Sequence, residues 1–313
     1  MFIVIPSLIL QLELSPQRKP MRSKFWLFSL SLLGILLYGI CQVRAAEKPK
    51  SVRIGMMRTI FKDTPDSLLQ ILMKPFSAVM ESQTGLSGDL VMTPSYDKLG
   101  KQLSDGDIQV GVFHGFEFAW AKLKYPELEP LMLAVNNKAP LKSYVVVADN
   151  SEIKSVNDLK GKSVSFARGN REHCRLFMEH RILPANTSAG KFFSKINNNA
   201  DAEDAFDGLA AGEVDSVLTD SAPWESFKTQ KPGTAGKLRV VMISEEFIPA
   251  VIGYNPKKLD NNIKDSFKKG MLSASENPKS KRMLEFVKIS SFEMIPEDFS
   301  TQMVEMLKSY PAQ

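Results

Sequence analysis

The sequence predicts an α/β fold with largely parallel sheets. Short strand-like and helix-like segments alternate from about residue 50 onward, which is the pattern of layered α/β proteins. The chain has 313 residues, 43% of them hydrophobic, so it can bury a sizeable core in one large or two medium domains. No internal repeat and no low-complexity tract interrupts this pattern.

The first elements are marked by their end signals. A strand is expected over 51–55, and Thr64 and Pro65 then form a good helix start, with Thr64 as the cap and Pro65 at the first helical position. Apolar residues recur at helical spacing from there to Gly85, which supplies the stop. Pro75 falls inside this run, so it is expected to kink the helix or to open a second one.

The next elements follow the same alternation. Short apolar runs predict the strands, and helical spacing of apolar residues predicts the helices. The strands are expected over 89–93, 106–113, 131–135 and 144–148, and the helices over 96–103 and 117–124.

A second unit then begins, and its elements are expected in the following order. They are a helical turn over 155–159, a strand over 163–167, a helix over 171–181 closed by Pro184, a helix over 202–211 and a strand over 215–219, after which the segment 238–243 leads out of the unit. After Pro249 the pattern becomes amphipathic and predicts helices over 263–275, 280–287 and 297–309.

The N-terminus has the order of a secretory signal peptide. From Met21 a basic start leads into an apolar stretch over 25–40, and a small-residue cleavage pattern ends at Ala45. We therefore expect residues 1–45 to be a leader, with Met21 as the true start. Two alternatives stay open: an uncleaved anchor, and a lipoprotein attached at Cys41.

The charge distribution and the motifs argue against a nucleic-acid-binding protein and against an enzyme. The formal charge is +5, but no run of like charge is long enough for a nucleic-acid arm. His173, Cys174 and His180 form at most a thin metal-ligand cluster, and neither GxSxG nor GxxxxGK occurs. We expect no enzyme activity, no metal and no cofactor. One cysteine would remain after cleavage, so the fold must rest on its core.

Several segments, in order, carry a resemblance to a known family. They are a Pro-opened helix ending in Gly (75–85), a strand ending near a Tyr (91–96), a turn and strand (106–112), a Gly loop with aromatics (114–116), SYVVVADNSEIKSVNDLKGKSVSFA, AAGEVDSVLTDSAPWESF and IPAVIGYNPKKL. Together they resemble the periplasmic binding proteins for phosphonate, phosphite and phosphate of ABC transporters, over residues 51 to about 299.

The resemblance implies a bilobal type II periplasmic-binding-protein fold, with two α/β lobes joined by a two-strand hinge. Lobe one would comprise 46–142 plus 248–313, and lobe two 143–247. The protein would capture a small oxyanion between the lobes and deliver it to the membrane permease of an ABC transporter. It would be an extracytoplasmic monomer, free or membrane-tethered. The alternative is a sensory module of the same fold for another anion or a carboxylate.

Oxyanion binding needs convergent donors, such as backbone N–H groups at helix starts, hydroxyls and a cation. The loop 167–171 lies between a strand and a helix of lobe two, and its Gly169 lets the backbone approach a ligand. Relatives carry a Ser/Thr-Ser-Gly cluster there, whereas this chain has two arginines and an Asn, which favours a larger or carboxylate-bearing ligand. The expected ligand contacts are Arg58, Thr59, Ser95, Tyr96, His114, Gly115, Phe116, Arg168, Gly169, Asn170, Arg171, Thr219, Asp220 and Ser221.

Two further side chains near these positions are interpreted separately. Glu117 follows the expected contact Phe116, and a carboxylate beside an oxyanion is unfavourable, so it faces a ligand amine or caps its helix. Trp224 is expected in the core.

Overall fold

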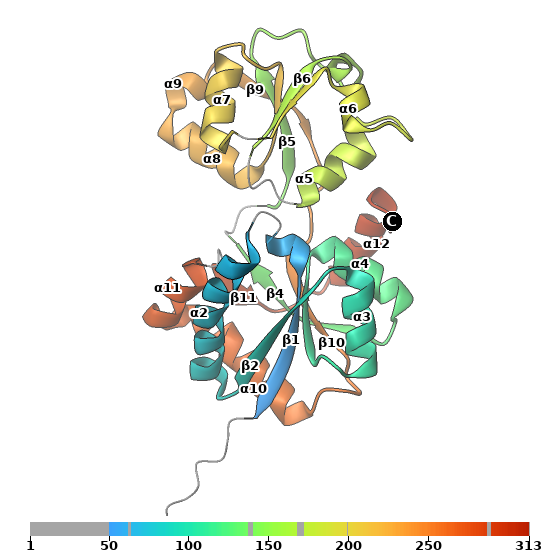
Figure 1. Cartoon of the computed structure of the whole chain (residues 1–313), viewed down its shortest axis with the longest axis vertical. Helices are drawn as coiled ribbons and strands as arrows, with labels where there is room; N and C mark the ends of the chain where they lie inside the picture. The colour runs from blue at the N-terminus through green and yellow to red at the C-terminus, as the bar shows by residue number, and fades with distance from the viewer. Residues whose placement is uncertain are drawn as a thin grey trace, which may run out of the picture. The chain divides into compact units, whose positions relative to one another are not determined.

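The computed structural model describes residues 50–61, 64–136, 140–167, 172–198, 200–286 and 289–312 (Figure 1). The predicted leader over 1–45 lies outside these residues. Two separate sheets organise the described chain, one of six strands and one of five. We call the residues around the six-stranded sheet lobe one and those around the five-stranded sheet lobe two.

The lobe-one sheet has the strand order β11-β4-β10-β3-β1-β2. Strand β1 pairs in parallel with both β2 and β3, whereas β10 is antiparallel to β3 and β4, and β11 is antiparallel to β4. The strands are β1 (Ser51–Met57), β2 (Ser87–Thr93), β3 (Val110–Phe113), β4 (Glu129–Val135), β10 (Ala250–Tyr254) and β11 (Ser291–Glu293).

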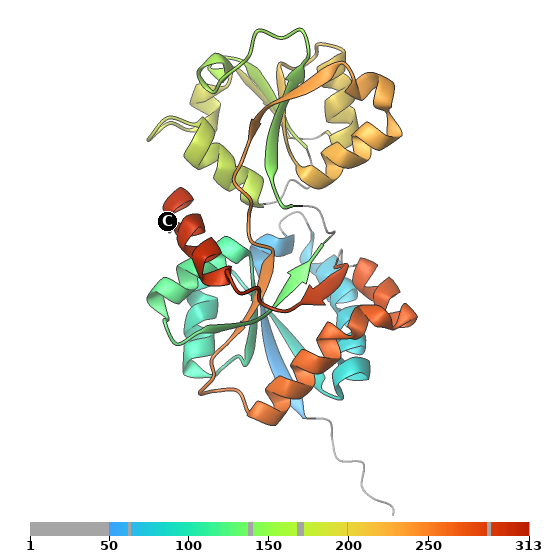
Figure 2. The ribbon, with the colours of Figure 1, turned by 180° about the vertical axis from the view of Figure 1, so that it is seen from behind.

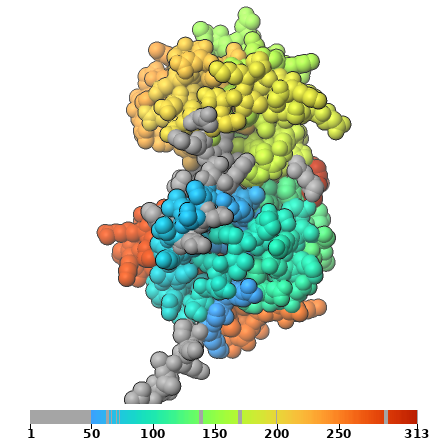
Figure 3. All heavy atoms as spheres, in the orientation of Figure 1, coloured from blue at the N-terminus to red at the C-terminus, as the bar shows by residue number. Residues whose placement is uncertain are grey.

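Helices cover both faces of this sheet, each over a separate apolar cluster. One cluster is closed by α2 (Asp66–Thr84), α10 (Asn261–Leu272) and α11 (Pro278–Phe286), with the 3-10 turn η4 (Ala274–Glu276). The other is closed by α3 (Tyr96–Asp105), α4 (Gly115–Lys124) and α12 (Phe299–Ser309). The outer faces of α2 and α3 lie at the surface in Figure 3, in blue and teal.

The lobe-two sheet has the order β7-β6-β8-β5-β9, with β6 parallel to β7 and β8, and β5 antiparallel to β8 and β9. Its strands are β5 (Ser143–Ala148), β6 (Ser163–Phe166), β7 (Lys195–Asn197), β8 (Ser216–Asp220) and β9 (Leu238–Ile243). Its helical segments are η2 (Asn157–Leu159), α5 (Glu172–Phe177), the π-helix η3 (Met178–Ile182), α6 (Ala189–Phe192), α7 (Ala202–Ala210), α8 (Ser221–Gln230) and α9 (Pro232–Ala235).

The chain passes between the two sheets after β4 and again after β9, as the two views from front and back show (Figures 1 and 2). The two crossing segments are hydrogen-bonded to each other. Ser143 donates its N–H to the Ser244 hydroxyl at 2.8 Å, and Phe247 donates its N–H to the Leu141 carbonyl at 2.8 Å. Two adjacent extended segments therefore join lobes that each have their own sheet, as expected for a two-strand hinge.

Two expectations about the strands were wrong. The sheets are mixed rather than largely parallel, because the strands next to the crossings, β5, β9 and β10, pair antiparallel to their neighbours. The central strand β10 was not predicted as a strand, since Pro249 and Gly253 interrupt its apolar run. Gly253 is needed there because a Cβ would lie 2.5 Å from the Phe118 ring.

The second helix was predicted in position but not in detail. Pro65 is the cap residue and Asp66 the first helical residue, one position later than expected. The helix continues through Pro75 to Thr84 and ends at Gly85, whose φ of 69° is left-handed. Pro75 therefore opens no second helix. Within the ranges that the structure describes, no helix is both long and apolar enough to span a bilayer.

Candidate functional site

The expected contacts of lobe one follow the carboxyl ends of neighbouring parallel strands. Met57 at the end of β1 is paired with Thr93 at the end of β2, and Met56 with Val112 of β3. The segments that follow these strands therefore begin at one edge of the sheet. Those segments carry Arg58 and Thr59 after β1, Ser95 and Tyr96 after β2, and His114, Gly115 and Phe116 after β3.

Lobe two repeats the arrangement. Strands β6 and β8 are parallel, with Phe166 paired to Leu218, so their carboxyl ends lie at one edge. The segment after β6 leads into the loop 168–171, and β8 ends in Thr219 and Asp220. The four expected contacts Arg168, Gly169, Asn170 and Arg171 lie outside the residues that the structure describes.

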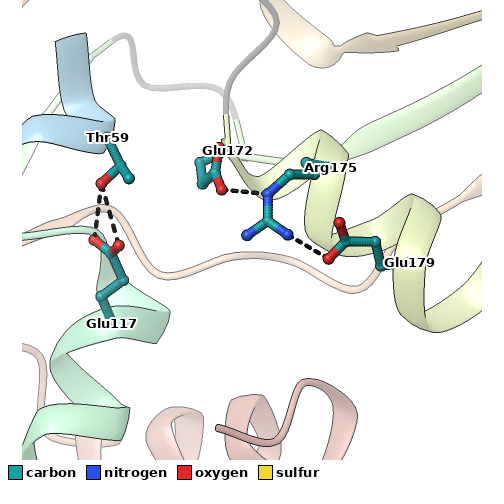
Figure 4. Close-up of polar contacts among 5 residues, drawn as sticks. All are labelled: Thr59, Glu117, Glu172, Arg175 and Glu179. Atoms are coloured by element: carbon teal, nitrogen blue, oxygen red, sulfur yellow. Dashed lines mark hydrogen bonds and ion pairs between the residues drawn. The ribbon is translucent and has the colours of Figure 1, made fainter. Parts of the chain in front are cut away.

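A buried carboxyl group lies at the lobe-one edge. Glu117, in the first turn of α4, is only 4% exposed. Its carboxylate accepts a hydrogen bond from the Thr59 hydroxyl at 3.1 Å (Figure 4) and one from the His114 N–H at 3.3 Å. The His114 side chain accepts from the Glu117 N–H, which completes a capping box. Of the two interpretations of Glu117, helix capping is the one that this geometry supports.

Burial dominates the electrostatics of Glu117. Loss of hydration raises its pKa from 4.5 to about 7, and the hydrogen bonds from His114 and Thr59 offset only part of this increase. Glu172 of lobe two raises the pKa further and Arg175 lowers it. Glu117 is therefore close to half-protonated at neutral pH, and its charge responds to groups on the other lobe.

Those groups form an ion-paired row on α5 and η3. Glu172 is 7% exposed and pairs with Arg175, which also pairs with Glu179 (Figure 4). The spacings of three and four residues place these side chains on one helix face. Arg175 and Glu179 were not among the residues expected at the site, although the charge pattern EHCRLFME at helical spacing indicates such a row.

The lobe-two contacts after β8 are tied to the backbone. Asp220 caps α8 by accepting the Ala222 N–H at 3.0 Å, and the Ser221 hydroxyl donates to the Pro140 carbonyl at 2.8 Å. Thr219 is fully buried in β8. This segment is thus anchored to the first crossing, next to the hinge.

The remaining lobe-one contacts differ in exposure. Ser95 is exposed and caps α3 by accepting the Lys98 N–H at 3.3 Å. Arg58 donates from its guanidinium to the backbone carbonyls of Phe61 and Thr64, which braces its own turn. Tyr96 is half-buried, with its ring 5.3 Å from the Trp120 ring.

Phe116 and Gly115 serve packing in this structure. Phe116 is 1% exposed, and its ring lies 5.3 Å from His114, in stacked geometry, and 5.0 Å from Trp120. A Cβ on Gly115 would lie 2.4 Å from the carbonyl oxygen of Ile248, so only glycine fits beside the second crossing. Trp224 is buried, as expected from the sequence, and Cys174 is buried as well.

The chain is similar in sequence and in fold to known binding proteins. The chain matches the family model "ABC transporter, phosphonate, periplasmic substrate-binding protein" over residues 59–298. Among curated proteins, a putative aliphatic sulfonates-binding protein of Escherichia coli is 27% identical over 194 residues. That match covers 61% of this chain and 55% of the relative, so it spans little more than half of the relative's length.

Solved structures share the fold at low sequence identity. A binding protein component of an ABC phosphonate transporter from Pseudomonas aeruginosa superposes with a TM-score of 0.54 at 17% identity, covering 82% of this chain and 85% of that chain. PhnD1 from Prochlorococcus marinus, solved in complex with methylphosphonate, gives a TM-score of 0.55 at 18% identity, covering 83% and 98%. A Xanthomonas citri protein bound to ATP gives 0.57 at 13% identity, covering 83% and 97%.

Proposed function

This chain belongs to the family of periplasmic substrate-binding proteins of phosphonate ABC transporters, and from that premise we propose that it captures a small phosphonate-like oxyanion between its lobes and delivers it to a membrane permease. The family is one of substrate-binding transport components, and its members act in the periplasm. Residues 1–45 act as the export leader in this proposal, and the mature protein acts as a monomer.

The observation that carries the proposal is the placement of donors at the carboxyl ends of parallel strands in both lobes. Helices α3, α4 and α8 begin directly after β2, β3 and β8, so their N-terminal N–H groups are directed toward these two edges. Aligned peptide dipoles make such helix starts favourable places for anions. The hydroxyls of Ser95 and Tyr96 add donors on lobe one.

Glu117 sets a condition on the ligand. An ionised carboxylate beside an oxyanion is unfavourable, and burial already moves the pKa of Glu117 to about 7. A bound anion raises that pKa further, so Glu117 is neutral in the complex and no longer repels the ligand. The lobe-two arginines of the loop 168–171 supply the compensating positive charge in this proposal.

A thermal-shift screen of purified residues 46–313 tests the proposal. Methylphosphonate is the first probe, since PhnD1 was solved with it, and an alkanesulfonate is the second, because the curated relative is described as sulfonate-binding. A binder at 100 times its Kd stabilises the protein by about 2.7 kcal/mol. A shift with the phosphonate supports the proposal. A shift with the sulfonate alone reassigns the ligand, and no shift with any oxyanion contradicts it.

A further inference from the structure

Tyr310, the residue after α12, is fully buried where the chain crosses between the lobes. Its hydroxyl donates to Glu245 Oε2 at 2.7 Å, and its carbonyl accepts the Trp120 indole N–H of α4 at 2.9 Å. Its ring centroid lies 4.8 Å from that of Phe247. Glu245 and Phe247 belong to the second crossing, between β9 and β10. Tyr310 therefore connects the lobe-one helix α4 to the second crossing.

Lobe two reaches the same point from the other side. Arg181, in the π-helix η3, pairs with the second carboxylate oxygen of Glu245, and its guanidinium lies over the Tyr310 ring at 5.5 Å from the centroid. The pKa of Glu245 is held below its usual value because hydrogen bonds from Tyr310 and Arg181 outweigh the effect of burial. Glu245 thus stays ionised between the Arg181 guanidinium of lobe two and the Tyr310 hydroxyl.

The same helix leads to the expected ligand loop. Segments α5 and η3 run without interruption from Glu172 to Ile182. Their first residue follows the loop 168–171, and their last turn carries Arg181. The π-helix η3 forms the second half of this run, and π-helical turns are rare and occur frequently at functional sites. One continuous helical segment therefore follows the expected ligand loop and contacts Glu245 near its last residue.

We propose that Tyr310, Glu245 and Arg181 form a third, non-covalent connection between the lobes, and that Tyr310 is a positioning residue for ligand capture. Two crossing strands alone leave lobe two free to twist about them. The contacts of Glu245 with Tyr310 and with Arg181 restrict that twist and fix the position of α5 relative to lobe one. A binding site assembled from two lobes gains affinity when their relative position is restricted in advance, because less freedom is lost on binding.

The direct test measures the spread of lobe positions without any ligand. Spin labels at Lys74→Cys on α2 and Asp204→Cys on α7 report the distance between the lobes; both side chains are exposed, and the outer faces of α2 and α7 are at the surface in Figure 3. The labelled protein comprises residues 46–313, in which the native cysteine Cys174 is buried and stays unlabelled. We expect Tyr310→Phe to broaden the distance distribution. A distribution as narrow as that of the unmodified protein overturns the proposal.

Tyr254 provides a matched control. Its hydroxyl donates to Glu129 Oε2 at 3.4 Å, and both residues belong to the lobe-one sheet. Tyr254→Phe therefore removes a tyrosine–glutamate hydrogen bond within one lobe and leaves the contacts between the lobes intact. We expect this variant to keep the narrow distribution. If the label distances broaden equally in both variants, the cause is a general loss of stability and not the contact between the lobes, which overturns the proposal. If Tyr310→Phe does not fold, Arg181→Gln tests the same connection from its half-exposed side.

The second readout is affinity, and it rests on the proposed function. Tyr310→Phe should weaken methylphosphonate binding about fivefold, whereas Tyr254→Phe should leave it within about twofold. An unchanged affinity in Tyr310→Phe, beside a lowered melting temperature, would mean that the contact serves only stability. If the unmodified protein binds no oxyanion, the proposed function fails while the label distances still decide the hinge connection.

Discussion

At the scale of single residues, the site combines anion donors with buried carboxyl groups. Glu117 and Glu172, on opposite lobes, are both less than 10% exposed, and each is held by defined partners. Sequence reasoning placed Glu117 beside the expected site, yet it could not give the protonation state, because that depends on burial by residues distant in sequence. The charge of Glu117 is therefore the residue-scale property that most needs measurement.

The pH dependence of stability measures that charge. The pKa of Glu117 is about 7 in the folded protein, against an ordinary value of 4.5 that applies to the unfolded chain. Between pH 4.5 and 7 the folded state therefore binds more protons than the unfolded state. Stability should consequently fall as pH rises from about 4.5 to 7, by about 3 kcal/mol in total. Glu117→Gln removes the titration and should flatten this part of the curve. Thermal unfolding at pH 5 and pH 8 checks it, and equal losses in both proteins would contradict the assignment.

Gly115 offers a test of packing at the same edge. Gly115→Ala places a Cβ 2.4 Å from the Ile248 carbonyl, so it should destabilise the protein by about 1–3 kcal/mol. Gly233→Ala is the control, because a Cβ there meets nothing within 4 Å, and it should be neutral or slightly stabilising. Urea unfolding of the two variants compares them. A Gly115→Ala variant as stable as the control would mean that α4 does not approach the crossing this closely.

At the scale of elements, local signals predicted most helices and strands to within a few residues. Helix α3 begins at Tyr96 as expected, and β8, expected over 215–219, spans Ser216–Asp220. The misses have physical causes. Strand β10 contains a glycine that its packing against Phe118 requires, and β7 and β11 are only three residues long, too short to show periodicity. The antiparallel strand directions follow from the crossings between lobes, which local sequence does not reveal.

The start of α3 separates capping from ligand contact. Ser95→Ala should cost about 1 kcal/mol, because the Lys98 N–H loses its acceptor. Ser95→Asp keeps an acceptor and the stability, but it brings a negative charge to the strand edge and should weaken oxyanion binding about tenfold.

Asp260→Ser is the control for this pair. Asp260 caps α10, which follows the antiparallel strand β10, so exchanging that cap should not affect affinity. Calorimetric titration with methylphosphonate gives the affinities. A Ser95→Asp variant that binds like the unmodified protein would remove this helix start from the site.

At the scale of the whole molecule, the order of segments identified the family and the bilobal fold, while contacts across the lobes were not predictable. Tyr310 gained its role from partners that are distant along the chain, since it lies 65 residues from Glu245 and 190 residues from Trp120. Capture between two lobes predicts that the lobes move toward each other when the ligand binds, while the helices and strands within each lobe keep their structure.

The distance between spin labels at Lys74→Cys and Asp204→Cys, with and without saturating methylphosphonate, tests this central claim most directly. Ligand-driven closure predicts that the ligand shortens the mean distance and narrows its distribution, while sodium chloride at equal ionic strength does neither. A distance distribution that stays unchanged at saturating ligand would contradict capture between the lobes.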